Sequence, residues 1–317
     1  MPKGKACWWN IFSIFLKKDN VKKSNYIIKP NLGFKTDAKG GTTNIEIIEA
    51  ALKVIREVYE PEELYLVESD GLAFKCEDVF QYLNLDKVCS KYDAKFMNLS
   101  KEPSVKLKNA SCSILKEFKI PKIFTKNNTI LVDLAKIKTH EIARLSCAIK
   151  NLFGLTEIFR VKYHPVIDEV LCDLYKIFKP DLTIVDGIWA INGHGPWTGE
   201  PVNLNTIIAS DDALLADIEC LKIIGWDVED VPYINRLINT KCELSYIVDG
   251  ELNKLEKFQW HKPSKLGLIK EGMARAAIPF LRRGFPLCYY SQRSFKLITY
   301  GGKGKYCKKI MSFPKEK

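Results

Sequence analysis

A histidine and a lysine stand ten residues apart in "LAKIKTHEIARLSCAIKNLFGL", residues 134–155. Their chemistry is reactive: a neutral imidazole takes or gives a proton near pH 7, and a partly desolvated lysine acts as a nucleophile or an anion ligand. His140 ends an apolar run typical of a buried strand. Lys150 falls one helical turn after Ser146 on the expected polar face, which taken alone is typical of a solvated lysine. His140 and Lys150 are nevertheless our candidate catalytic pair.

The elements around this pair alternate between strand and helix from residue 25 onward, which predicts an α/β fold. We expect a mixed or mostly parallel sheet, or sheets, with helices on both faces. An arrangement as two lobes around a cleft is open, and a C-terminal extension follows. The predicted strands cover 25–33, 63–71, 95–100, 129–138, 181–191 and 205–210, with less regular strands in 105–124. The predicted helices cover 43–60, 76–92, 142–153, 164–178 and 211–225.

Polar residues cluster where the predicted strands end, and ligands of α/β sheets bind outside those strand ends. The stretch "KGGTTN" before a helix resembles an anion cradle, because free backbone N–H groups and the helix dipole attract anions. It is also an ordinary Gly-Gly turn capped by threonine. The predicted substrate-binding residues are Lys29, Asn31, Thr42, Thr43, Lys138 and Asn151.

Further candidates lie in the second half of the chain. Imidazole suits nickel, iron and zinc, so His164 and His194 are candidate metal ligands. Asp186 lies within the strand predicted over 181–191, and Gly195 and Gly199 in the loop that follows either admit a ligand close to the backbone or serve a tight loop. Asp211 begins a helix, where capping is the default role of a carboxylate.

Charge and cysteine content restrict the class of protein. The chain has 49 basic and 38 acidic residues in 317, a net charge of +11, which suits anionic partners. The basic residues are spread along the chain and accompany no nucleic-acid-binding motif, so we expect a small anionic molecule. Ten scattered cysteines form no CxxC, so we predict no iron–sulfur cluster held by this chain. Scattered cysteines are typical of buried, reduced thiols, which predicts a cytoplasmic protein.

The sequence divides into three parts: an apolar and basic segment at 1–24, an α/β core at 25–240 and a basic extension at 241–317. Residues 6–16 are apolar, but a membrane span needs about 20 residues. We expect this segment to dock on the core. The alternative is an interfacial anchor with Trp8, Trp9 and Phe12 at lipid headgroups.

Six motifs occur in one order between about residue 25 and about residue 230. They are "IIKPNLG", "GGTTN", "AKIKTH", "IKNLFGL", "VDGIWAINGHGPWTG" and "IIASDDALLADI". In sequence and order they resemble the domain-of-unknown-function family 362. Members often carry a ferredoxin-type module rich in cysteine, which this chain lacks. The resemblance implies an α/β core and a ferredoxin-like protein as a candidate partner, but no settled activity.

A second resemblance is to the apoprotein of the nickel-pincer lactate racemase. Asp133, His140, Lys150 and His164 follow the order of residues in that family. The resemblance implies a lysine that holds the pincer covalently, a histidine acid/base and a later histidine that ligates nickel. The Gly-Gly-Lys of the racemase is replaced here by "CAIKN", and the other catalytic histidine has no counterpart.

These observations lead to three hypotheses from different classes. The first is an enzyme that binds a small carboxylate or phosphate, with His140 as acid/base and Lys150 as anchor, and with nickel or iron as candidate cofactors. The second is a redox protein that works beside an iron–sulfur partner. The third is a nucleic-acid-binding module that uses the basic tail after residue 240.

Overall fold

The computed structural model of this protein describes residues 24–34, 39–71, 74–156, 160–240 and 256–260. These residues all belong to one compact unit, and two lobes are not seen among them. The predicted N-terminal segment lies outside the described residues except for Ser24. Most of the predicted extension does too, including the tail considered for nucleic-acid binding.

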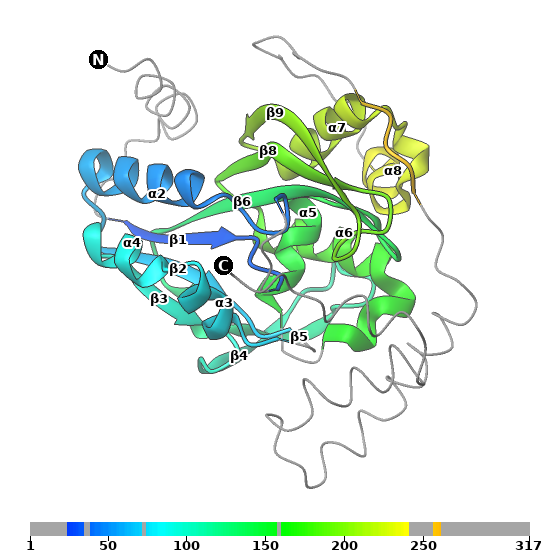
Figure 1. Ribbon diagram of the computed structural model, residues 1–317. Coiled ribbons are helices and arrows are strands. Elements are labelled where there is room, and N and C mark those ends of the chain that lie inside the picture. Colours follow the sequence, from blue (N-terminus) through cyan, green and yellow to red (C-terminus); the bar gives the residue numbers. More distant parts are fainter. Residues whose placement is uncertain (1–23, 35–38, 72–73, 157–159, 241–255, 261–317) are drawn as a thin grey trace, which may run out of the picture. The chain divides into compact units, whose positions relative to one another are not determined.

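The unit is built on one seven-stranded sheet (Figure 1) with the order β3-β2-β1-β6-β8-β9, and β7 pairs with β6. The pairs β3/β2, β2/β1, β1/β6 and β6/β8 are parallel, whereas β8/β9 and β6/β7 are antiparallel. The predicted mostly parallel α/β fold is therefore confirmed. The strands are β1 Asn25–Pro30, β2 Glu63–Glu68, β3 Lys95–Asn98, β6 Thr129–His140, β7 Arg144–Ser146, β8 Leu182–Asn192 and β9 Glu200–Ser210.

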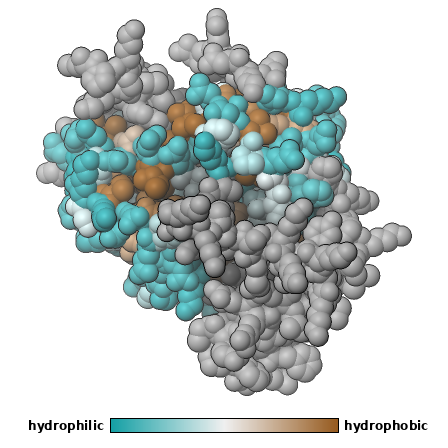
Figure 2. Space-filling model, in the orientation of Figure 1, coloured by the Kyte–Doolittle hydropathy of each residue, from teal (hydrophilic) through white to brown (hydrophobic). Residues whose placement is uncertain are grey.

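Helices cover both faces of the sheet, because alternate side chains of the strands point to opposite faces. Tyr26 and Ile28 of β1 pack into one core with α2 and α4, while Ile27 packs into the other core with α5, α6, α7 and α8. On the face drawn in Figure 2, hydrophilic side chains surround the smaller apolar patches. The helices are α2 Ile45–Val54, α3 Cys76–Tyr82, α4 Leu85–Lys91, α5 Ala148–Asn151, α6 Ile167–Phe178, α7 Ala213–Ile224 and α8 Pro232–Asn239.

The single helix predicted over 142–153 is wrong. The chain turns at residues 141–143, and Arg144 has a φ of 63°, a left-handed conformation that a helix interior does not adopt. The strand β7 follows and runs back along β6, and only then does the short helix α5 form. Lys150 therefore does not stand on the polar face of a helix that contains Ser146.

The helix predicted over 76–92 is two helices, α3 and α4, because Asn84 takes a left-handed φ of 52° between them. The region 105–124 forms a separate two-stranded antiparallel sheet of β4 Ser104–Lys108 and β5 Glu117–Pro121. Asp173 of α6 fastens the loop between these strands. Its buried carboxylate accepts hydrogen bonds from the backbone N–H groups of Ser113, Ile114 and Leu115 at 2.9, 2.7 and 2.9 Å.

Replacing Asp173 with alanine should therefore loosen the β4–β5 sheet from the core. Three backbone donors would lose their acceptor at once, and we expect a loss on the order of 3 kcal/mol in the free energy of unfolding. Urea unfolding of Asp173→Ala measures this loss. The exposed Asp86→Ala is the matched control, and equal stability of the two variants would contradict the fastening role.

Candidate functional site

The order in which strands are added to the sheet reverses between β1 and β6. Strands β2 and β3 are added on one side of β1, whereas β6 and then β8 are added on the other. Such a switch point is where open α/β sheets bind ligands, outside the carboxyl ends of the strands. Lys29 lies near the end of β1 and Lys138 and His140 at the end of β6, so three of the predicted site residues flank this point.

Lys29 is the best-anchored cation of this edge. Its side chain is 1% exposed, and Nζ lies 2.8 Å from Oε2 of Glu68 at the end of β2. Nζ also donates to the carbonyl oxygen of Pro30 at 2.6 Å. The carboxylate of Glu68 in turn accepts backbone N–H groups of Leu32 and Ser69 at 3.0 and 2.9 Å. A buried pair of this kind persists only when its remaining polar atoms are also hydrogen-bonded.

Asn151 of α5 connects strands β1 and β6. Its Nδ2 donates to the carbonyl oxygen of Lys29 at 3.2 Å and to Oδ1 of Asp133 at 2.7 Å. Its Oδ1 accepts from Nδ2 of Asn31 at 3.1 Å and from Nζ of Lys29 at 3.5 Å. Oδ1 of Asn31 then accepts from Nζ of Lys138 at 2.7 Å. One chain of hydrogen bonds thus runs from Lys138 through both asparagines to Asp133.

Asp133 lies at the buried end of that chain. Its side chain is fully buried, and Oδ2 has no hydrogen-bond partner. Burial raises the pKa of Asp133 to about 8. The hydrogen bond from Asn151 and the charge of Lys29 lower this pKa, but their effect is smaller than that of burial. The carboxyl is therefore protonated at neutral pH, and it does not offset the positive charge of the lysines.

Lys138 and Lys150 share a low basicity but differ in their contacts. Burial, with a smaller effect of neighbouring cations, lowers the pKa of each to about 7. Nζ of Lys138 is held by Asn31 and by the carbonyl oxygen of Gly41 at 2.6 Å. Nζ of Lys150 instead lies 4.4 Å from the centre of the Phe153 ring. No ion pair joins Lys150 to a carboxylate among the described residues.

The imidazole of His140 has one ring nitrogen committed to the backbone. Nδ1 accepts hydrogen bonds from the N–H groups of Ile142 and Ala143, both at 3.2 Å. Burial lowers the pKa of His140 well below its usual value, and the charges of Lys150, His164 and Lys138 add to this effect. The ring is therefore neutral with its hydrogen on Nε2, so His140 presents an N–H donor.

Two further basic residues border the cluster. Arg160 donates from Nη1 to Oγ of Ser69 at 2.9 Å, and its charge acts on Lys150. The rings of Phe153 and His164 stack, with centroids 5.9 Å apart. The structure thus brings Lys29, Lys138, His140, Lys150 and Asn151 together, with His164 at the border.

The "KGGTTN" turn offers less to a ligand than its sequence indicates. Oγ1 of Thr43 donates to the carbonyl oxygen of Leu134 and accepts the N–H of Asn31, both at 2.8 Å. Asn44 caps α2, and its own N–H donates to Asp186 at 2.7 Å. Asp186 also pairs with Lys136 at 2.8 Å. Thr43 and Asp186 therefore join the sheet to the start of α2; Thr42 is half-buried beside them.

The sequence of this chain is similar to those of known proteins. A family model described as a domain of unknown function, DUF362, matches residues 27–222. The chain belongs to the DUF362 family. A thylakoid-associated protein of Synechocystis sp. is 30% identical over 140 residues, 43% of this chain and 42% of the relative. The chain thus spans less than half of that relative's length.

A crystal structure of a Thermotoga maritima protein is also similar. It has 10% sequence identity and a TM-score of 0.37, and the likeness covers 68% of this chain and 57% of the other. At these values it adds nothing on function. The resemblance to the nickel-pincer racemase stays a prediction.

The remaining predicted residues of this DUF362 protein lie in the loop after β8 or at the start of α7. A Cβ on Gly195 would lie 2.1 Å from the carbonyl oxygen of Thr139, and one on Gly199 would lie 2.3 Å from that of Asn192. These glycines therefore allow close packing of the loop after β8. His194 is exposed in that loop. The cap of α7 is Asp212, which accepts the N–H of Leu214 at 2.7 Å, so capping by Asp211 is wrong.

Nickel and iron were candidate cofactors. Among the described residues there is no group of three or more His, Cys, Asp or Glu side chains that could hold a metal ion. Nδ1 of His140 is also committed to backbone N–H groups. The residues that the structure describes therefore do not fit a metal ion bound by protein side chains alone.

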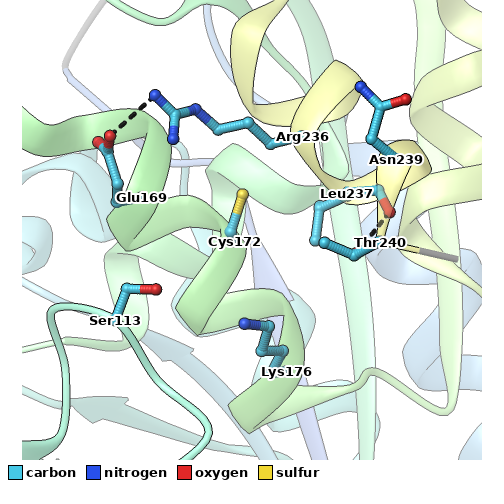
Figure 3. Close-up of a pocket in the computed structure, with 8 residues that line it drawn as sticks. All are labelled: Ser113, Glu169, Cys172, Lys176, Arg236, Leu237, Asn239 and Thr240. Atoms are coloured by element: carbon cyan, nitrogen blue, oxygen red, sulfur yellow. Dashed lines mark hydrogen bonds and ion pairs between the residues drawn. The ribbon is translucent and has the colours of Figure 1, made fainter.

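A pocket of about 320 Å³ lies between α6 and α8 (Figure 3). Arg236 and Glu169 form an ion pair of 2.9 Å at its rim. Burial raises the pKa of the Cys172 thiol to about 12, so this sulfur stays protonated at neutral pH. The pocket thus offers no activated nucleophile, and we do not regard it as the reaction site.

Three important residues were not among the predicted site residues. Glu68 could have been selected because it ends an apolar strand. Arg160 has no comparable signal in the sequence. Asp217 falls inside the helix predicted over 211–225; it is fully buried and accepts the N–H groups of Ala148 and Ile149 at 2.7 and 3.2 Å. It thereby holds the first turn of α5, the element that carries Lys150.

The protonated state of Asp133 has a measurable consequence. Its pKa is near 3.8 in the unfolded chain and about 8 in the folded protein, so folding binds a proton between these values. This contribution to stability is present at low pH and is lost as pH rises toward 8. In Asp133→Asn, the free energy of unfolding should therefore rise relative to wild type between about pH 4 and pH 8.

Denaturant unfolding at several pH values measures this difference. The exposed Asp86→Asn serves as the control and should show no such trend. A constant gap between Asp133→Asn and wild type across the range would show that Asp133 is ionised in the folded protein.

Proposed function

We propose that this DUF362 protein is an enzyme that binds a small carboxylate or phosphate at the ends of β1 and β6. The observation that carries this proposal is the excess of cations there. Lys29, Lys138, Lys150 and Arg160 converge on this edge, and of these four cations Lys29 forms an ion pair, with Glu68 at 2.8 Å. Burying cations without counterions is costly, and an anionic ligand offsets that cost.

The roles of the residues follow from their contacts. Lys138 and Lys150 attract the anion, and the hydrogen bonds of Asn31 and Asn151 keep Lys138 and Lys29 in place. His140 offers Nε2–H to a substrate oxygen, which is the acid side of the predicted acid/base role. A neutral histidine in such a position polarises a carbonyl group without giving up its proton completely. Isomerase-like chemistry at a carbon next to a carboxylate suits these groups.

We also propose that the protein acts in the cytoplasm. The described cysteines at 76, 89, 112, 147, 172 and 220 are free and buried, as in reducing compartments. No helix in the described part of the chain is long and apolar enough to cross a bilayer. The Synechocystis relative is described as thylakoid-associated, so membrane association is the competing location. Fractionation of cells that express the full chain distinguishes the two.

Anion binding should take up protons. Lys138 and Lys150 have a pKa of about 7 without a ligand, so a bound anion raises their pKa and draws protons from the buffer. Above pH 7 the affinity should therefore fall as pH rises. Calorimetric titration with inorganic phosphate or lactate, in two buffers of different ionisation enthalpy, measures this uptake.

The variant Lys138→Met should lower the affinity for these probes about tenfold or more, as expected for loss of one charged hydrogen-bond donor. Lys162→Met, which removes an exposed lysine, is the matched control and should bind as wild type does. Absence of binding by wild type, or binding of equal strength in both variants, would contradict the proposed site.

A further inference from the structure

Lys138 and Lys150 are both poorly basic lysines, but only one is placed to form a bond. The N–H groups of Lys138 are directed to the oxygens of Asn31 and Gly41, and an attack by its nitrogen would break these two short hydrogen bonds. Nζ of Lys150 has the Phe153 ring as its neighbour. An aromatic ring supports a cation only weakly when compared with two carbonyl oxygens.

We propose that Nζ of Lys150 forms an imine with the carbonyl carbon of a small anionic carbonyl compound, an oxo acid or a phosphorylated ketone. This inference rests on the proposed function, because it assigns a substrate class to the same site. It goes further in making Lys150 a nucleophile and not only an electrostatic anchor.

The surroundings of Lys150 match the two ends of such a substrate. After burial, the charges of Arg160 and Lys29 act most strongly on Lys150. Lys29 is already held by Glu68, so Arg160 is the cation that we assign to the carboxylate or phosphate. The charge of Lys150 helps to lower the pKa of His140, and the neutral His140 provides an N–H donor for the carbonyl oxygen of the substrate. Phe153 covers the amine with an apolar surface. A lysine kept neutral by neighbouring cations and by desolvation is an established way to activate an amine for imine formation.

The same surroundings make Lys150 more reactive toward carbonyl compounds than exposed lysines are. With a pKa of about 7, half of Lys150 is neutral at pH 7. An exposed lysine with a pKa near 10.4 has a neutral fraction about a thousandfold smaller. Attack requires the neutral amine, so Lys150 should react while exposed lysines do not.

The proposed step is balanced without another reactant. The nitrogen lone pair forms the C–N bond, and one N–H hydrogen moves to the carbonyl oxygen to give a carbinolamine. The remaining N–H hydrogen and the hydroxyl group then leave as water, and the C=N bond forms. Protonation of this imine by solvent gives a cationic nitrogen that draws electrons from the neighbouring carbon. A proton on that carbon becomes more acidic, which suits the isomerase-like chemistry proposed above.

Reductive trapping of the full chain tests the inference. The protein is incubated at pH 7 with pyruvate or with dihydroxyacetone phosphate, cyanoborohydride is added, and intact mass and peptide mapping follow. Hydride addition converts the imine into a stable amine, so the expected adduct is the probe minus one oxygen atom, located on Lys150. Labelling by pyruvate alone indicates an oxo acid, and labelling by the phosphate alone indicates a phosphorylated ketone.

Lys150→Arg keeps the positive charge but cannot form an imine, so its adduct should be lost. Lys162→Arg, in which an exposed lysine is replaced, should be labelled on Lys150 as wild type is. Thermal unfolding checks that Lys150→Arg is folded, and an excess of lactate, which has no ketone, should compete with labelling of wild type by pyruvate.

The possible failures are separable. If wild type binds phosphate or lactate but gives no adduct on Lys150 with either probe, the imine is wrong and the proposed anion site stands. If it neither binds these anions nor forms the adduct, both proposals are wrong. Equal labelling of exposed lysines, or an adduct that persists in folded Lys150→Arg, also overturns the imine.

Discussion

The buried side chain of Lys29 constrains the positions of the strand ends and of α5 at the switch point of the sheet. It needs Glu68 at 2.8 Å from the neighbouring strand and an amide oxygen from Asn151, so β1, β2 and α5 must end together. Gly154 lies against this pair, because a Cβ there would be 2.8 Å from Cε of Lys29. Since a buried charge without its partners costs several kcal/mol, this contact largely fixes where the segment after β7 can lie.

Asn151 extends this constraint to the rest of the site. A single amide has two donor hydrogens and an acceptor oxygen, and here they reach the main chain of β1, the carboxyl of Asp133 and the side chains of Asn31 and Lys29. Because donors and acceptors alternate along the chain of hydrogen bonds, the orientation of each amide is determined. The chain of hydrogen bonds begins at Nζ of Lys138, which donates to Asn31, and ends at Oδ1 of Asp133, which accepts from Asn151.

The low dielectric of this region changes the chemistry of ordinary side chains in different ways. Burial makes Lys138 and Lys150 poor bases, but oxygen acceptors hold Lys138 as a donor, whereas Lys150 lies against an aromatic ring. His140 is kept neutral by burial and by two backbone N–H groups that occupy Nδ1. Three basic residues of one site thus become three different functional groups, and the atoms in contact with each side chain decide which one it becomes.

The sequence by itself determined the α/β class, because strand and helix periodicities are local. It indicated Lys29, Asn31, Lys138 and His140 through their places near strand ends, whereas Lys150 and Asn151 were indicated by the resemblance of their motif to a known family. Only the tertiary structure decided the strand order, the hairpin of β6 and β7, and the partners Glu68, Arg160 and Asp217. The helix predicted over 142–153 failed because apolar spacing cannot report a left-handed Arg144. Charge states also required the structure, since the pKa of a lysine depends on burial and on neighbours that are distant in sequence.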